Sequence, residues 1–204
     1  MRRFVSPGFR KRAAAGLAVA GLAALVAACT SSAPPSGRRP AASQASRTAS
    51  VGQITASAAG PIRPGTTYSL AGLKAAAPGF TVTPIETAVE SRTTAAFGLF
   101  YDGMQTFQVF KGADGKVGDV HGVGDRVVGP AGERIGMTMA EAGTQPRECR
   151  MGKDLWIGMA ICTSHGARNV QLVYSIPGYM DFTHLPPANE LREAMLQRIV
   201  WRPN

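Results

Sequence analysis

A short apolar run that ends at a single cysteine separates the part of this chain that can build a core from the part that cannot. Residues 1–12 carry five basic side chains and no acidic one, and residues 13–28 contain only Ala, Gly, Leu and Val before Cys29. A helix that spans a bilayer needs about 20 apolar residues, and this run has 16. A basic start, a short apolar run and small residues before a cut are the parts of a secretory signal. We predict that residues 1–28 are a signal peptide; the alternative is a permanent N-terminal anchor helix.

The residues Val26-Ala27-Ala28-Cys29 resemble the bacterial lipobox, in which a branched apolar residue and two small residues precede a cysteine. The resemblance implies that the Cys29 thiol is linked to diacylglycerol, that the peptide is cut before Cys29, and that the new amine is acylated, for example with palmitate. Because each buried methylene contributes about 0.8 kcal/mol, two or three acyl chains hold a protein on a membrane essentially permanently. We therefore predict a lipoprotein that is anchored to a membrane without spanning it; the alternative is an ordinary signal peptide followed by a cysteine.

Residues 29–63 are predicted to form a flexible tether. Ala, Ser, Pro, Gly and Arg dominate this segment, and large apolar side chains are scarce. Such a composition cannot bury enough surface to offset the entropy cost of ordering the chain. No acidic residue directly follows Cys29, which in a Gram-negative cell favours sorting to the outer membrane. We expect an exported protein held on the periplasmic face of that membrane.

The formal net charge of +9 does not indicate a nucleic-acid-binding protein. Five positive charges lie in the predicted signal and four in the tether, whereas residues 64–204 contain 13 basic and 13 acidic side chains. A basic patch for phosphates is therefore not indicated for the folded part. We expect contact with a membrane through the N-terminal lipid, a protein or cell-wall partner, and no nucleic acid.

Assigning Cys29 to lipid leaves Cys149 and Cys162 as a pair. Disulfides persist in exported proteins, and the segments around these two residues have the character of neighbouring strands joined by a turn at 152–154. A bridge closing a loop of about 14 residues would stabilise the fold by roughly 3 kcal/mol in the chain-entropy model. A metal site would need more ligands at short spacing, so we predict a structural disulfide.

Residues 64–204 are predicted to fold as one α+β domain with a mostly antiparallel sheet. A helix is expected at 67–77, with Ser69 as its N-cap and Pro78-Gly79 at its end. Strands are expected at 80–83, at 93–101 and at 104–110, the last two joined by Asp102-Gly103, which is a strong hairpin signal. A second Asp-Gly pair at 114–115 precedes another strand at 117–123.

The second half of this segment has a similar order of elements. We predict a short helix at 138–141, where Thr138 and Glu141 have capping-box spacing, strands at 156–162 and 170–176, a helix around 189–197, and an extended segment at 199–203. A helix followed by hairpin strands thus occurs twice. We predict an internal duplication of a helix-plus-meander unit, with two or three short helices in all.

Four groups of residues resemble the YfeY-like family of RpoE-regulated lipoproteins of unknown function. The resemblance covers most of the chain from the first predicted helix onward. It implies a lipoprotein of the outer membrane that faces the periplasm and is linked to envelope stress, and it brings no catalytic residues. The matching groups are Lys116-Val117 with Val127-Val128-Gly129-Pro130, then Glu133-Arg134-Ile135-Gly136-Met137, the pair Cys149 and Cys162, and Leu185-Pro186-Pro187 with Ile199-Val200-Trp201-Arg202-Pro203.

The side chains that carry chemistry form no recognisable catalytic or cofactor motif. His121, His165 and His184 each stand alone in their segments, without a second metal ligand two or four residues away. Ser164 precedes His165 in a predicted turn, but a nucleophile needs a base and an orienting group and no elbow motif is present. Gly122-Val123-Gly124 lacks the third glycine of a dinucleotide fingerprint, because Val127 occupies that place.

The methionines and aromatic residues are interpreted as core. Met137, Met139, Met151 and Met159 have the soft thioethers of Cu(I) sites, but methionine more often fills irregular gaps in a core. Tyr101, Trp156 and Tyr174 fall in predicted strands and are expected inside the fold. We predict no catalytic residue, no cofactor and no metal site.

The leading hypothesis is a non-enzymatic envelope lipoprotein that presents a disulfide-bonded domain for binding or envelope maintenance. The first alternative is an inhibitor of a cell-wall-degrading enzyme of the lysozyme type, a role that small disulfide-bonded lipoproteins serve. The second is an envelope enzyme whose site the sequence does not reveal, which would require a pocket of convergent polar groups.

Overall fold

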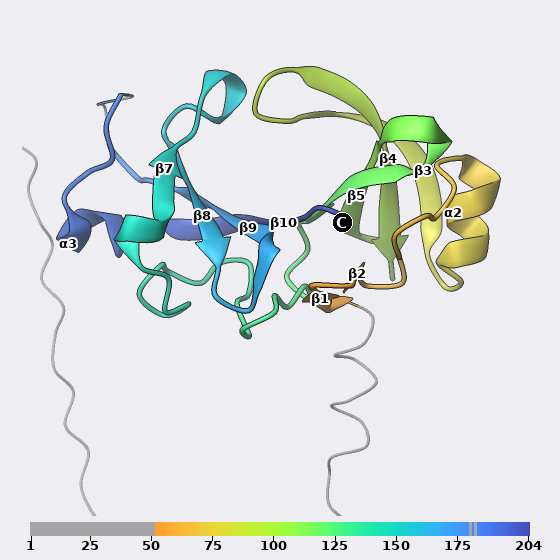
Figure 1. Cartoon of the computed structure of the whole chain (residues 1–204), viewed down its shortest axis with the longest axis horizontal. Coiled ribbons are helices and arrows are strands. Elements are labelled where there is room, and N and C mark those ends of the chain that lie inside the picture. The colour runs from red at the N-terminus through yellow and green to blue at the C-terminus, as the bar shows by residue number, and fades with distance from the viewer. Residues whose placement is uncertain (1–51, 180, 182) are drawn as a thin grey trace, which may run out of the picture. The chain divides into compact units, whose positions relative to one another are not determined.

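The computed structural model describes residues 52–179, 181 and 183–204 (Figure 1). The predicted signal peptide, the predicted lipidation site Cys29 and the first part of the predicted tether lie outside these residues. In the described part of the chain, no helix is both long enough and apolar enough to cross a membrane.

Eight of the described strands form one antiparallel sheet made of two meanders (Figure 1). Each meander has four consecutive strands, and the last strand of the first pairs with the last strand of the second, with Val200 opposite His121. The resulting order is β3-β4-β5-β6-β10-β9-β8-β7, which confirms the predicted α+β class with a mostly antiparallel sheet. The strands are β3 (Thr81–Ala88), β4 (Thr93–Tyr101), β5 (Met104–Lys111), β6 (Val117–Gly122), β7 (Cys149–Met151), β8 (Met159–Ser164), β9 (Ala167–Ser175) and β10 (Met195–Trp201).

Local turn chemistry sets the hairpins of the first meander. Asp102 and Gly103 both have positive φ, 49° and 76°, which a two-residue hairpin turn requires and which Asp-Gly tolerates well. The predicted hairpin between β4 and β5 is therefore present, with Tyr101 paired to Met104. The second Asp-Gly pair lies in the short 3-10 helix η1 (Ala113–Gly115) that leads into β6.

The first predicted helix is present as α2 (Leu70–Ala76). Ser69 is its N-cap, because the Ser69 Oγ accepts a hydrogen bond of 3.0 Å from the Gly72 amide. The helix buries Leu73 completely against the sheet. Outside the sheet and α2, the described elements are the 3-10 helices η2 (Pro146–Glu148) and η3 (Asp154–Trp156), the helix α3 (Ala188–Leu191) and the short strands β1 (Ile54–Thr55) and β2 (Ala58–Ala59).

Two predicted helices are wrong. The predicted helix at 189–197 is only the single turn α3, and the chain then enters β10 at Met195. Ala, Met, Leu, Gln and Arg favour a helix locally, but pairing of β10 with both β6 and β9 outweighs that weak preference. The segment at 138–141 is a turn in which Glu141 accepts hydrogen bonds from Thr138. Backbone bonds from Met139 and Ala140 to the Ala194 and Arg192 carbonyls replace those of a helix.

The predicted boundary between tether and domain at residue 64 is also wrong. Ile54, Ala59 and Ile62 are fully buried in the main core, and the Ile54 amide donates a 2.8 Å hydrogen bond to the Val128 carbonyl. Gly122 leaves the space that Ile54 and Val127 fill, since a Cβ there would lie 2.9 Å from Ile54 Cδ1 and 2.5 Å from Val127 Cγ1. Residues 52–63 therefore belong to the folded domain.

The two faces of the sheet are covered differently. Side chains alternate between faces along a strand, and one face packs the main core, which includes Leu99, Phe107, Leu172, Tyr174 and Trp201. The opposite face has a smaller apolar cluster of Trp156, Ile161, Val173 and Val200. The loops that follow β3 and β7 lie on the same side of the sheet (Figure 1). The second of these loops carries Trp156 of the smaller cluster, and the two loops enclose the candidate site.

Candidate functional site in an arch over the sheet

Glu90 joins the two loops above the sheet. Its carboxylate accepts hydrogen bonds of 2.6 and 2.7 Å from the Arg150 guanidinium and one of 2.9 Å from the Lys153 amide. The Glu90 carbonyl accepts a fourth, of 2.9 Å, from the Leu155 amide. Hydrogen bonding to Arg150 lowers the pKa of Glu90. These bonds connect the β3–β4 loop to the segment between β7 and β8, and we call this connection the arch.

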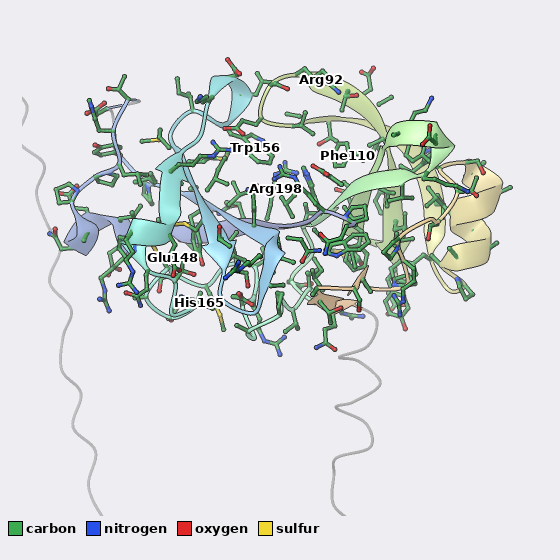
Figure 2. All side chains as sticks on the ribbon, in the orientation of Figure 1. Arg92, Phe110, Glu148, Trp156, His165 and Arg198 are labelled. Atoms are coloured by element: carbon green, nitrogen blue, oxygen red, sulfur yellow. A yellow bond between two sulfur atoms is a disulfide. The ribbon has the colours of Figure 1, made fainter. Side chains whose placement is uncertain are left out.

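A cavity of about 780 Å³ lies between the arch and the sheet, and we call it the arch cleft. This volume falls in the range of small-molecule sites, roughly 300–1,000 Å³. Figure 2 shows Arg92, Phe110, Trp156 and Arg198 on the side of the sheet where the arch lies. The lining comes from the β3–β4 loop, the start of β4, the end of β5, β6, η3 and the residue after β10; it includes Val89, Glu90, Arg92, Thr94, Phe110, Lys111, Asp119, His121, Lys153, Asp154, Trp156 and Arg202.

The floor of the arch cleft is aromatic, with His121 at its centre. The His121 ring lies 4.4 Å from the Phe110 ring and 5.7 Å from the Trp156 ring, measured between centroids. His121 is 1% exposed, and its Nδ1 has no hydrogen-bond partner among the described residues. Burial, together with the nearby charges of Arg198 and Arg202, lowers the pKa of His121 to about 3. The imidazole is therefore neutral at neutral pH.

Arg198 supplies a half-buried cation on the same face. Its Nη1 donates a 2.7 Å hydrogen bond to the Gln108 Oε1, which also accepts one of 3.2 Å from Thr87. No carboxylate in the described part of the chain forms a salt bridge with it, and burial lowers the pKa of Arg198. Arg198 lines a second hollow of about 670 Å³, which Gln108 also lines. Gln108 of β5 is paired with His121 of β6, which lines the arch cleft, so the two hollows are neighbours on this face of the sheet.

The charges around the arch cleft leave an excess of unpaired cations. Of its lining carboxylates, Glu90 is bonded to Arg150, and Asp119 lies 3.3 Å from the Arg202 Nε. Three lining cations, Arg92, Lys111 and Lys153, form no salt bridge with any described residue. Among the lining carboxylates, the same is true of Asp154. The arch cleft thus combines an apolar floor with a positive rim.

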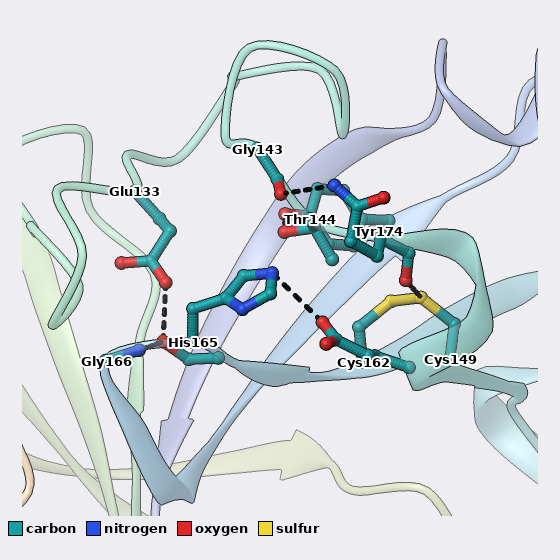
Figure 3. Close-up of polar contacts among 11 residues, drawn as sticks. Glu133, Gly143, Thr144, Cys149, Cys162, His165, Gly166 and Tyr174 are labelled. Carbon is teal, nitrogen blue, oxygen red and sulfur yellow. Dashed lines mark hydrogen bonds and ion pairs between the residues drawn. A yellow bond between two sulfur atoms is a disulfide. The ribbon is translucent and has the colours of Figure 1, made fainter.

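The predicted disulfide is present at the β7 edge of the sheet (Figure 3). Cys149 and Cys162 lie directly opposite each other in β7 and β8, with a Cα–Cα distance of 4.0 Å and an S–S distance of 2.06 Å. The bridge attaches the three-residue edge strand β7 to the sheet. Because β7 carries Arg150, the disulfide also holds one end of the arch.

Ser164 and His165 do not form a nucleophile–base pair (Figure 3). The Ser164 Oγ donates a 2.5 Å hydrogen bond to the buried Glu133 carboxylate, whereas the His165 Nε2 lies 3.1 Å from Glu148 Oε2. Glu133 also accepts a 2.8 Å bond from the Ala131 amide. These contacts join the loop at 129–133 to the end of β8.

The other candidates from the sequence are dispersed. His184 contacts Asp181 at 3.3 Å on an exposed loop. Met139 is fully buried in the main core and Met159 packs against the cluster on the opposite face. In the regions that the structure describes, no three His, Cys, Asp or Glu side chains lie close enough to share a metal ion. Tyr101 and Tyr174 lie in strands, and burial raises the pKa of Tyr174 to about 12.

Sequence reasoning missed the arch cleft. Trp156 was expected in a strand, but it ends η3 and reaches over the sheet. His121 lies in β6, within the strand predicted at 117–123, but nothing in its own segment indicates that Phe110 and Trp156 pack beside it. The alternation Arg198-x-Val200-x-Arg202 would have placed both arginines on one face if residues 195–201 had been recognised as a strand.

Comparison with known proteins agrees with this architecture. No family model matches the sequence, and no curated protein matches it either. The fold defines a class of α+β domains in which two antiparallel meanders share one sheet. A solved structure with a similar fold is that of the uncharacterised protein YfeY from Escherichia coli, which superposes with a TM-score of 0.59 at 12% identity, over 74% of this chain and 99% of that one. The resemblance to YfeY is thus confirmed at the level of the fold.

Proposed function

We propose that this protein is an exported lipoprotein, anchored through Cys29 on the periplasmic face of the outer membrane, whose sheet domain binds a small ligand in the arch cleft. The observation that carries the binding role is the arch cleft itself, a cavity of about 780 Å³. Three of its lining cations, Arg92, Lys111 and Lys153, form no salt bridge with any described residue.

A binding role accounts for the local arrangement better than catalysis does. Ser164 is bonded to Glu133 and His165 contacts Glu148, so neither activates the other. The arch cleft instead has the volume of a small-molecule site, and it is lined by charged and polar side chains together with Phe110 and Trp156. The disulfide and the Glu90–Arg150 contact hold its walls in position before a ligand arrives, which reduces the ordering cost of binding.

The anchor is supported by the sequence at 26–29 and is tested by lipid labelling. Cells that express the full chain are grown with radiolabelled palmitate, and the protein is followed into the membrane fraction. The wild type should be labelled and sedimented with membranes, whereas a Cys29→Ala variant should carry no label. Label on the Cys29→Ala variant would contradict the proposed anchor.

The binding role is tested by filling the arch cleft. The full-length protein is extracted from membranes in mild detergent and weighed by native mass spectrometry. Thr94→Trp places an indole in the lining, while the adjacent Thr93 lies outside the lining and Thr93→Trp serves as the matched control. We expect a co-purified small molecule on the wild type and on Thr93→Trp, and its loss from Thr94→Trp. A molecule retained by all three proteins, or found on none, would contradict a ligand in the arch cleft.

A further inference from the structure

The second hollow has the features of a binding site of its own. Its volume of about 670 Å³ falls in the range of small-molecule sites, roughly 300–1,000 Å³. It lies near the starts of β5 and β10 and beside the residues that follow β6, and its lining includes Met104, Gln108, Met159, Gln197 and Arg198. None of these five residues lines the arch cleft, so a ligand bound here is independent of one bound there.

Arg198 is the one cation in the described lining of the second hollow. It is half-buried, and no carboxylate among the described residues forms a salt bridge with it. Burial lowers the pKa of Arg198, and no neighbouring carboxylate offsets that effect. Because a charge taken from water is costly unless it is paired, arginine is seldom buried without a counterion. The second hollow therefore contains a cation that an anionic ligand would pair.

Gln108 fixes the orientation of the Arg198 guanidinium. The Gln108 side chain is buried, and its Oε1 accepts hydrogen bonds of 2.7 Å from Arg198 Nη1 and 3.2 Å from Thr87 Oγ1. Its Nε2 donates one of 3.3 Å to Gln105 Oε1. The other N–H groups of Arg198 form no hydrogen bond with a described residue. One end of the guanidinium is thus held, while the remaining donors are available to a ligand.

The charge balance of the second hollow favours a ligand with a single negative charge. Two adjacent N–H groups of a guanidinium match the two oxygens of a carboxylate. The lining also contains Asp125, which is exposed and forms no salt bridge with a described residue. With one cation and one carboxylate in the lining, a doubly charged phosphate ester would keep uncompensated charge. A monocarboxylate is paired completely by Arg198.

Methionine side chains form the apolar part of the lining. Met104 is 61% exposed, and Met159 is partly buried beside the cluster around Trp156. The unbranched thioether side chain adapts to different shapes, which suits it to contact with small organic groups. Covering such a surface is favourable by about 25 cal/mol per Å². The ligand therefore gains affinity from an apolar group next to its carboxylate.

We propose that the second hollow binds a small organic monocarboxylate, with its carboxylate paired to the Arg198 guanidinium and its apolar part against Met104 and Met159. Gln108 is then a positioning residue, because it holds the guanidinium without being needed as a ligand contact. The arch cleft takes no part in this site.

The test uses benzoate as the probe and its neutral isostere benzamide as the chemical control. Binding to the full-length protein in lipid nanodiscs is measured by calorimetry, with empty nanodiscs subtracted. Benzoate should bind roughly tenfold more tightly than benzamide, because charge-assisted hydrogen bonds are about twice as strong as neutral ones. Phenyl phosphate, which is largely dianionic at about pH 8, should bind more weakly than benzoate.

Methyl NMR of the methionines locates the bound benzoate. The protein carries ¹³C-labelled methionine methyl groups, and the signals of Met104 and Met159 are assigned by substitution with leucine. Both signals should shift as benzoate is added. The signal of Met139, which is fully buried in the main core, should not shift.

Arginine variants test the ion pair. Arg198→Gln should remove the preference for benzoate over benzamide. Arg168→Gln is the matched control, since Arg168 is an exposed arginine of the neighbouring strand β9 outside the second hollow, and it should keep the preference. Thermal unfolding checks that Arg198→Gln is folded.

A second pair of variants gives a result even if Arg198→Gln does not fold. Met104 is largely exposed, so Met104→Glu and Met104→Gln should both leave the core intact. The new carboxylate of Met104→Glu competes with the ligand for Arg198. Benzoate should bind this variant about threefold or more weakly than it binds Met104→Gln.

The outcomes also separate the second hollow from the arch cleft. Equal affinity for benzoate and benzamide, binding of neither, or tighter binding of phenyl phosphate would overturn the proposal. A preference that survives in folded Arg198→Gln, or equal binding by the two Met104 variants, would do the same. Thr94→Trp should bind benzoate as the wild type does, and its failure to do so would place benzoate in the arch cleft. None of these results decides the binding role of the arch cleft, which depends on the co-purified molecule.

Discussion

At the scale of single residues, buried polar groups on the two faces of the sheet differ in how they are paired. On the main-core face, Glu133 bonds to Ser164, and Tyr174 bonds to Thr144 at 2.7 Å. On the other face, His121 Nδ1 and Gln171 Oε1 are buried without a partner in the described residues. A third buried atom without a hydrogen bond, Glu148 Oε2, lies 3.1 Å from His165 Nε2. Because such groups are rare in native proteins, we interpret the unpaired histidine as a functional feature.

The burial of His121 predicts a loss of stability in mild acid. Its folded pKa of about 3 lies below the unfolded value of 6.5, so the unfolded state binds a proton first as the pH falls. Stability is unaffected above pH 6.5 and declines between pH 6.5 and 3, by up to roughly 1.4 kcal/mol per pH unit. Between pH 7.5 and 5.0, the free energy of unfolding of the wild type should fall by roughly 2 kcal/mol more than that of His121→Phe. Urea unfolding measures both, and identical pH dependence would show that the imidazole is not kept neutral.

At the scale of elements, the arch depends on contacts between segments that are far apart in the sequence. The strands β3 and β7 are the two edges of the sheet, and only their following loops meet. Glu90 and Arg150 belong to different meanders, and no local pattern in the sequence brings them together. The arch therefore joins two halves that also meet through the β6–β10 pairing, the Arg198–Gln108 hydrogen bond and the Asp119–Arg202 pair.

Breaking this contact should loosen the arch with little effect on global stability. Glu90→Gln removes the charge that Arg150 and the Lys153 amide bind, but both side chains are partly exposed, so the loss of stability should stay below about 1 kcal/mol. Amide hydrogen exchange at residues 152–158 should become faster. Asp102→Asn breaks the exposed Asp102–Arg126 pair at the opposite hairpin and should leave that exchange unchanged. If Glu90→Gln also leaves exchange unchanged, the arch is held by other contacts.

The elements that were predictable from the sequence are those set by local chemistry. The Asp102-Gly103 turn and the Ser69 cap act within a few residues, and both were recognised. Residues 195–197 of β10 were placed in a predicted helix, whereas residues 199–201 fall in the predicted extended segment. The full strand was not predicted because its neighbours β6 and β9 come from distant parts of the chain. The arch cleft was not predicted for the same reason, since its lining residues span positions 89–202. The disulfide was predicted because assigning Cys29 to lipid leaves Cys149 and Cys162 as a pair, and no sequence motif was needed for that prediction.

At the scale of the whole molecule, the sheet has a symmetrical order of strands that agrees in part with the predicted duplication. Each half contributes a meander of four strands, and the halves meet through antiparallel β6 and β10. The helix of the predicted unit is present before the first meander as α2. Before the second, the chain forms turns and η2 instead. The meander is repeated and the helix is not.

The N-terminal segment that completes the main core provides a test at this scale. Ile54 is fully buried, so Ile54→Ala should reduce the free energy of unfolding by about 2–5 kcal/mol. The neighbouring Thr55 forms only exposed side-chain contacts with Ser57, and Thr55→Ala should cost less than about 0.5 kcal/mol. Chemical denaturation of both variants gives the comparison. Equal effects would mean that residues 52–63 are not part of the cooperative fold.

The position of β10 has a consequence for how the chain reaches its destination. This strand follows all the others in the sequence, yet it lies between β6 and β9 at the centre of the sheet. Until it arrives, β6 and β9 both present open edges, and the two meanders have no shared backbone ladder to cooperate through. Synthesis from the N-terminus therefore produces seven strands before the one that joins them. A polypeptide that must pass through a narrow translocation channel benefits from such a delay, because its sheet cannot close while the last segment is still inside, and this suits the export that we propose.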